Sequence, residues 1–264
     1  KPLLETIGNA ALQDDYRSTL KSFYGALKSK DDCIKFAMLT GVTKFGKVSV
    51  FSDLNNLKDI SLNNRYYNLC GIDEGELHGV FEPYVQRLAD SQNITLDKAY
   101  SELKRNYDGY HFSKNMVGMY NPFSLLNAFD SLEIGSYWFE TGTPSYLVEL
   151  LKRHDFKLDE LKGNKVTANV LSAIDASSSD PIPVIFQSGY LTISGYNERY
   201  KLYSLDFPNE EVREGFMLYL MPYYTSVSVN KTGFQISCFV EEVKSGDISG
   251  FMTRLESFFA NVPY

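Results

Sequence analysis

One short segment most constrains what this chain can form. Gly41–Lys47 reads G-V-T-K-F-G-K, which fits the phosphate-loop pattern, but the next residue is Val48 instead of Ser or Thr. A working phosphate loop needs that hydroxyl, because it ligates the Mg²⁺ that bridges the nucleotide phosphates. Val48–Phe51 also alternates like a β-strand, whereas a phosphate loop opens directly into a helix. We therefore predict that this segment is not a phosphate loop.

The residues around the segment predict a piece of an α/β layer. Apolar residues at helical spacing predict a helix over residues 11–30, and the apolar run Cys33–Leu39 is typical of a buried strand. In open α/β sheets, ligands bind outside the carboxyl ends of the strands. Thr40, Thr43 and Lys44 follow the predicted strand, so we expect them to face a nucleotide if loops elsewhere hold one.

The composition excludes several classes of protein. The chain has 264 residues, of which 44% are hydrophobic and 22% charged, as in a soluble globular protein of one or two domains. It has no apolar stretch of membrane-spanning length and no secretory signal. Three dispersed cysteines and three histidines predict neither a disulfide framework nor a metal site, and the cytoplasm is the expected compartment. A net charge of −7 argues against a broad nucleic-acid-binding surface.

Helix signals dominate the middle of the chain. Asp73 with Glu76 matches a capping box, Pro83 predicts a kink or a new helix, and Thr95 caps a helix that ends near Gly109. Further helices are predicted over Pro122–Phe129 and up to Leu151.

A second unit is predicted after the polar boundary at residues 163–181. Residues 190–205 have the pattern of a β-hairpin, Asn209 caps a following helix, and Phe234–Val243 and Ile248–Phe259 are two closing helices. Helix, hairpin and helix are consistent with a winged-helix-like module. The predicted fold class is thus an α/β fragment followed by a mostly α-helical region with a winged-helix-like α+β module.

Several segments, in this order, resemble the AAA-ATPase-like family over nearly the whole chain. They are Leu39–Leu57, Tyr107–Phe112, Tyr120–Ser124, Tyr137–Pro144, Phe186–Leu191 and Phe207–Arg213. In that family a P-loop ATPase is typically followed by a PD-(D/E)XK nuclease domain. The resemblance implies that the phosphate loop and the Walker B acids lie before residue 1 and that the nuclease domain lies after Tyr264.

The same resemblance assigns roles along the chain. It implies that residues 1–62 complete an ATPase core, 63–162 form a helical lid, 163–225 the winged-helix-like module and 226–264 a helical linker. Thr40, Thr43 and Lys44 are the implied nucleotide-sensing residues, and no catalytic residue is expected. ATP and Mg²⁺ would act in the intact parent and not in this chain alone. A nuclease domain and, through the parent, nucleic acid are the implied partners, with no membrane.

Some residues admit two interpretations. Asp108 and His111 could form an acid/base pair, but a helix C-terminus, where Asp stabilises the turn and His suits the dipole, accounts for both. The helix after Asn209 carries three glutamates, which would repel phosphate, so a structural or protein-contacting role is favoured over DNA binding. Glu241, Glu242 and Lys244 resemble the end of a nuclease motif, yet no acidic strand precedes them and a helix surface is favoured.

Two functional classes follow. One is the sensor, lid and winged-helix part of a nucleotide-driven switch that controls a nuclease and is inactive alone. The alternative is a non-enzymatic protein-interaction module.

Overall fold

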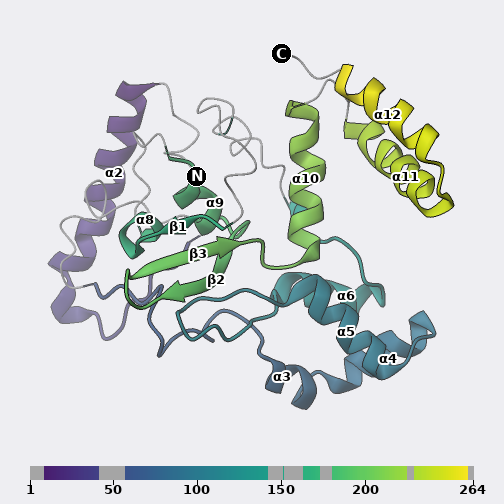
Figure 1. Cartoon of the computed structure of the whole chain (residues 1–264). Helices are drawn as coiled ribbons and strands as arrows, with labels where there is room; N and C mark the ends of the chain where they lie inside the picture. The colour runs from purple at the N-terminus through teal and green to yellow at the C-terminus, as the bar shows by residue number, and fades with distance from the viewer. Residues whose placement is uncertain are drawn as a thin grey trace.

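The computed structural model describes residues 9–41, 57–141, 151, 163–172, 180–224 and 229–260. These residues form helices and a small antiparallel sheet (Figure 1). The elements are α2 (Ala10–Ser29), η1 (Asp31–Cys33), α3 (Glu74–Gly79), α4 (Glu82–Gln92), α5 (Leu96–Tyr107), α6 (Pro122–Ser131), η2 (Trp138–Thr141), β1 (Lys165–Val166), α8 (Ala168–Ser172), α9 (Ile182–Gln187), β2 (Thr192–Asn197), β3 (Leu202–Asp206), α10 (Glu210–Tyr224), α11 (Val229–Ser245) and α12 (Ile248–Ala260).

The predicted buried strand at Cys33–Leu39 is wrong. Asp31–Cys33 forms a 3₁₀ turn, and residues 34–41 continue without regular structure. Phe36, Met38 and Leu39 expose much of their side chains. A strand is stable only when a neighbouring strand takes its backbone hydrogen bonds, and within the described ranges no strand pairs with this segment. The apolar run therefore predicted neither the conformation nor the burial of this segment correctly.

Residues 72–134 form a helical unit whose boundaries follow from local capping. Asp73 and Glu76 form a reciprocal capping box at the start of α3, and Pro83 lies in the first turn of α4. Thr95 and Asn121 accept backbone hydrogen bonds at the starts of α5 and α6. These caps satisfy amides that a helix leaves free at its start. The enclosed core contains Leu77, Val85, Leu88, Ala99, Leu103, Tyr107, Tyr120, Leu125 and Phe129.

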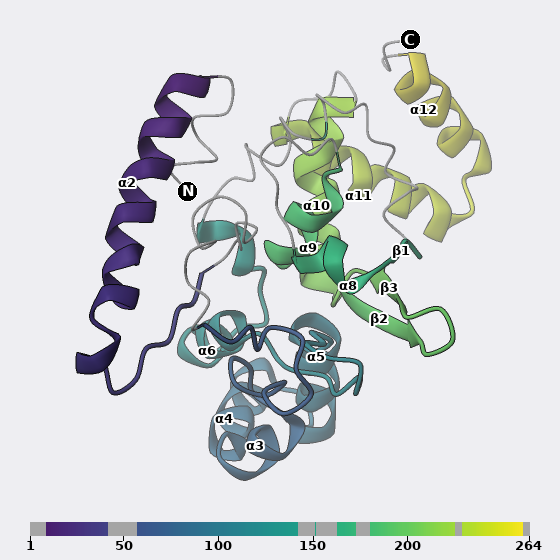
Figure 2. The same cartoon turned by 90° about the vertical axis from the view of Figure 1, so that its left-hand side faces the viewer.

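A three-stranded antiparallel sheet with the order β1–β3–β2 forms the second unit. The hairpin predicted over residues 190–205 is confirmed as β2 and β3, with an irregularity between Ile193 and Gly195. The chain runs β1, α8, α9, β2, β3 and then into α10 (Figure 2). Ile193 and Leu205 are fully buried in its core, which also includes Ile185, Val212 and Phe216.

The two units meet where α5 ends and α10 begins. Gly109 has a φ of +103°, and a Cβ at this position would lie 2.1 Å from the carbonyl oxygen of Pro208. Only glycine fits here, since a side chain would be strained by the backbone angle and would collide with Pro208. Next to it, Asn209 Nδ2 donates to the carbonyl oxygen of Asp108 at 3.1 Å.

The two closing helices are confirmed as α11 and α12, which pack against each other beside α10 (Figure 1). Phe239 meets Phe251 edge to face with 5.4 Å between ring centroids, and Arg254 donates to Glu242 at 2.7 Å. Among the described residues, no helix is both long and apolar enough to span a membrane.

Candidate functional site

The predicted nucleotide-sensing residues are not brought together in the described part of the chain. Thr40 lies in the exposed, irregular segment after η1. Thr43 and Lys44 lie outside the described residues. Their role therefore stays a prediction.

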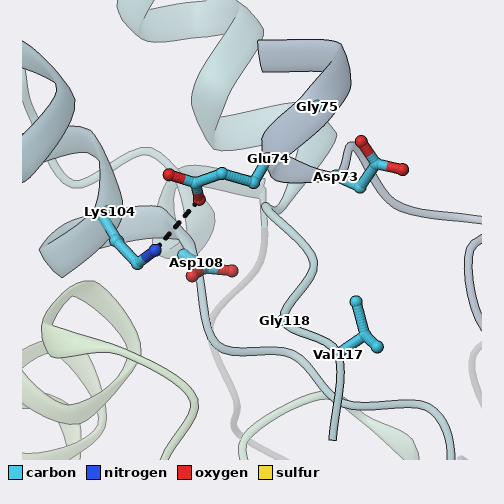
Figure 3. A pocket seen from close by; sticks show the side chains of 7 residues that line it. All are labelled: Asp73, Glu74, Gly75, Lys104, Asp108, Val117 and Gly118. Carbon is cyan, nitrogen blue, oxygen red and sulfur yellow. Dashed lines mark hydrogen bonds and ion pairs between the residues drawn. The ribbon is translucent and has the colours of Figure 1, made fainter. Parts of the chain in front are cut away.

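A pocket of about 370 Å³ lies between α3, α5 and the loop before Met119 (Figure 3). Its walls come from the start of α3, the end of α5 and an extended segment that bridges to Tyr110 through Met119. The lining residues are Asp73, Glu74, Gly75, Lys104, Asp108, Val117 and Gly118. Three carboxylates and one ammonium group thus share one small, open site.

Glu74 makes several polar contacts within this pocket. Its Oε2 accepts hydrogen bonds from Lys104 Nζ at 3.1 Å and from the Tyr120 hydroxyl at 2.9 Å. His78 Nε2 lies 3.5 Å from Oε1. Burial alone would raise the pKa of Glu74, but the bonds from Tyr120 and Lys104 outweigh it and hold the pKa below its usual value. Lys104, Tyr120 and His78 thus surround this carboxylate.

Asp108 stands in a different environment. Burial raises the pKa of its carboxyl group, although the Gly109 amide and the Lys104 charge act in the opposite direction. Its Oδ1 is buried and has no hydrogen-bond partner among the residues that the structure describes. A Cβ at Gly118 would come within 2.7 Å of that oxygen, so the glycine backbone closes the site on this side. A desolvated carboxylate in a cleft is a known mark of functional sites, although structural networks also produce it.

His111 does not pair with Asp108. Its Nδ1 lies 2.7 Å from the carbonyl oxygen of Ile193, and its backbone amide donates to Thr192 Oγ1 at 2.7 Å. The imidazole therefore fastens the loop after α5 to the start of β2. These contacts fit the structural interpretation and give no acid/base pair.

Most of the polar side chains that line the pocket bond to neighbouring residues. Within the described ranges, no group of three or more His, Cys, Asp or Glu side chains could hold a metal ion. Lys104 neutralises Glu74, while Asp73 caps α3 through the Glu76 amide. The arrangement orders α3 against α5 and leaves one desolvated carboxylate, Asp108, beside the junction with the sheet unit.

Sequence reasoning missed the role of Glu211. It treated the acidic start of α10 as a phosphate-repelling surface, but Glu211 is 2% exposed. Its Oε1 accepts the backbone amides of Tyr137 at 2.7 Å and Trp138 at 2.9 Å. A buried carboxylate is stable only when such donors surround it. Glu211 thus ties η2 to α10, and no local pattern signals this, since the donors are more than seventy residues away.

An aromatic contact completes this attachment. The ring of Phe139 packs on Gly215 of α10, where a Cβ would overlap the ring. Trp138 meets Tyr190 edge to face with 4.8 Å between centroids. The connection between the helical unit and the sheet unit is therefore held by a carboxylate and by packed rings.

Comparisons with known proteins now add to this picture. Residues 1–51 match the model of the AAA-ATPase-like family, which is described as a predicted AAA-ATPase. This match supports the resemblance drawn from the sequence. The chain is also similar to an Azotobacter chroococcum mcd 1 protein named "Uncharacterized protein in vnfD 5'region", with 36% identity over 273 residues. That match covers 100% of this chain and 49% of the relative, so the chain spans about half its length. No solved structure matches the chain significantly.

Proposed function

We propose that this chain is the sensor, lid and winged-helix-like portion of an AAA-ATPase-like, nucleotide-driven switch. The observation that carries the proposal is the family match over residues 1–51, which include Thr40, Thr43 and Lys44. On the same chain, a helical unit and a sheet unit are fastened together by Glu211, Asn209 and His111. A rigid connection of this kind can carry a movement from a nucleotide site to a distant domain.

Two further features support the finer assignment. The element order β1, α8, α9, β2, β3 with the sheet order β1–β3–β2 is the arrangement expected of a winged-helix-like module. Its α9 is largely buried, which favours a structural role for the module over reading of DNA by that helix. Control of a nuclease domain, action on nucleic acid, and use of ATP and Mg²⁺ by the intact protein rest on the resemblance alone.

The test compares this chain with a version extended at its N-terminus. ATP and Mg²⁺ are titrated into both by calorimetry, and phosphate release is measured. We expect binding and turnover only in the extended protein. There, Thr43→Ala and Lys44→Ala should each lower turnover about tenfold to a hundredfold, the loss of one charge-assisted contact, while nucleotide affinity changes much less.

Other outcomes would overturn this proposal. Turnover by the present chain that vanishes on Lys47→Ala would mean that Gly41–Lys47 is a working phosphate loop. Parental turnover in both variants of the extended protein would reduce Thr43 and Lys44 to connecting residues.

The second candidate is a non-enzymatic interaction module, favoured by one observation. α11 and α12 expose apolar side chains that a protein partner could cover, namely Phe234, Val243, Ile248, Met252 and Phe259. Exposed apolar patches of this kind mark protein contact sites. Failure of the extended protein to bind nucleotide would favour this second function.

A further inference from the structure

Positive charge gathers at one end of the sheet unit, although the chain as a whole has a net charge of −7. The turn end of the hairpin, residues 194–204, carries two basic residues and one acidic residue, and the adjoining loop at residues 113–117 and strand β1 add one basic residue each. The other acid of the hairpin, Asp206, lies at the far end of β3. By contrast, helices α3–α6 carry seven acidic and four basic residues.

The four basic residues and one exposed ring between them are here called the hairpin patch. Its members are Lys114, Lys165, Arg199, Tyr200 and Lys201. Lys114 lies in the loop of the helical unit and Lys165 lies on β1 opposite Ser204, while the other three form the turn itself. All five side chains are exposed. The patch is therefore assembled from three separate segments of the chain.

The one carboxylate in this turn is already neutralised. Lys114 Nζ donates to Glu198 Oε1 at 3.0 Å, although the two residues are 84 positions apart. The same ammonium group lies 5.4 Å from the centroid of the Tyr196 ring. The loop of the helical unit thus supplies the charge that cancels Glu198, so this carboxylate repels an approaching anion less than a free one.

The remaining basic residues of the patch keep their charge available. Within the described ranges, Lys165, Arg199 and Lys201 form no ion pair. Basic residues on the helical unit differ, as Lys98 and Arg105 on α5 both pair with Glu102. An exposed cluster of cations without counter-charges fits an anionic partner.

Aromatic rings alternate with these charges. Tyr200 exposes 62% of its surface, and the Arg199 guanidinium lies 5.4 Å from the centroid of its ring. Behind the turn, Tyr196 and Tyr203 pair across the strands at 4.6 Å between centroids. Surfaces that bind single-stranded nucleic acid combine cations for the phosphates with rings on which bases stack. An acidic peptide would use the charges but would leave the Tyr200 ring without a role.

The turn holds these groups in one arrangement. Asn197 Oδ1 accepts the Tyr200 backbone amide at 3.0 Å, and Lys201 has a φ of +53°, which closes the turn. Figure 2 shows the turn projecting from the sheet, clear of the labelled helices. A projecting turn with a defined conformation loses little conformational freedom when it binds a ligand.

We propose that the hairpin patch binds single-stranded nucleic acid. Arg199 and Lys201 contact backbone phosphates, one base stacks on the Tyr200 ring, and Lys165 extends the positive surface along the sheet. Lys114 acts indirectly, by neutralising Glu198. The contact is made by the hairpin and not by the buried helix α9. It goes beyond the nucleotide-driven switch and is tested without ATP, so failure of one proposal leaves the other standing.

Fluorescence anisotropy of a labelled single-stranded DNA of about fifteen nucleotides, within the site sizes of such surfaces, tests this on the whole chain. We expect saturable binding that the double variant Arg199→Ala, Lys201→Ala weakens about tenfold or more at low salt. The slope of log affinity against log salt should become shallower by about 1.4, because each phosphate contact on a single strand contributes about 0.7. Tyr200→Ala should weaken binding about fivefold or more and leave the slope unchanged, since stacking releases no counterions.

The matched control removes the same charge elsewhere. Lys98→Ala combined with Arg105→Ala also deletes two cations, and it leaves Glu102 unpaired on α5. This variant should bind the DNA like the parent, with the same salt slope. Thermal unfolding followed by circular dichroism checks that every variant keeps its fold.

Lys114 gives an independent readout. Lys114→Ala frees the Glu198 carboxylate and should weaken binding, whereas adding Glu198→Ala to that variant should restore much of the affinity. A purely structural role of Lys114 predicts no such rescue, because the second change cannot rebuild the lost contact.

Four results would overturn the proposal. The first is no binding at about 100 μM protein, the weak end of non-specific nucleic-acid affinities. The second is parental binding by the Arg199 and Lys201 double variant, and the third is an equal loss in the α5 control. The fourth is displacement of the DNA by a polyglutamate peptide at equal concentration, which would indicate an acidic protein partner.

Discussion

Replacing Glu211 by alanine should loosen the connection between the helical unit and the sheet unit. The variant leaves the amides of Tyr137 and Trp138 without their acceptor, which now lies 2.7 and 2.9 Å away. An unsatisfied, partly buried donor costs about 1–3 kcal/mol, so two of them lower the free energy of unfolding by about 2–6 kcal/mol. Glu211→Gln keeps an acceptor oxygen and should lose less.

The chain offers a close control for this experiment. Glu210 precedes Glu211 on α10, but within the described part of the chain its carboxylate makes only a surface pair with Arg213 at 2.8 Å. Exposed pairs of this kind contribute about 0–1 kcal/mol, so Glu210→Ala should hardly change stability. Both variants are measured by urea denaturation.

Fluorescence reports on the same contact. Trp138 is the single tryptophan of the chain, and its backbone amide is one of the two bound by Glu211. Its emission should shift to the red in Glu211→Ala before global unfolding and stay unchanged in Glu210→Ala. Equal stability losses in the two alanine variants, or an unshifted emission in Glu211→Ala, would refute the reasoning.

Three further changes test other contacts. Gly109→Ala places a side chain at a φ of +103° and against the Pro208 carbonyl, so thermal unfolding should show that the free energy of unfolding falls by about 2 kcal/mol or more. Gly79→Ala is the control, because a Cβ at Gly79 meets open space and should not lower the stability. Gly215→Ala should displace the Phe139 ring, with a loss of about 1–3 kcal/mol in urea unfolding. Because burial raises the pKa of Asp108 in the folded state, its ionisation destabilises the fold as pH rises above the unfolded value of 3.8. Asp108→Asn should therefore gain stability relative to the parent at pH 7 and lose that gain at pH 3, as denaturation at both pH values would show.

Local signals predicted much of the helical framework. Asp73, Thr95 and Asn121 cap their helices through hydrogen bonds within three residues, so the sequence contains both partners of each bond. The hairpin was equally local, because β2 and β3 are joined by a short turn. These elements can therefore be predicted from local sequence, without their contacts to the rest of the chain.

Contacts between distant segments were beyond the sequence. The apolar run Cys33–Leu39 has strand composition, but composition does not supply a neighbouring strand. Glu211 has the appearance of a surface acid at the start of a helix, and its burial is decided by Tyr137 and Trp138. The burial of Asp108 Oδ1 likewise depends on the position of Gly118 beside the end of α5.

The meeting of Asp108 and Asn209 has a consequence for the order in which the chain folds. Their hydrogen bond joins residues 101 positions apart, whereas α3–α6 are held by contacts within about sixty residues of each other. Because local contacts close smaller loops, we expect the helical unit to form first, and during synthesis it is complete before Asn209 leaves the ribosome. Because Gly109 lies close to Pro208, the folded end of α5 then provides the surface on which α10 starts. Substitutions of Gly109 should therefore slow the folding of the sheet unit more than the folding of the helical unit.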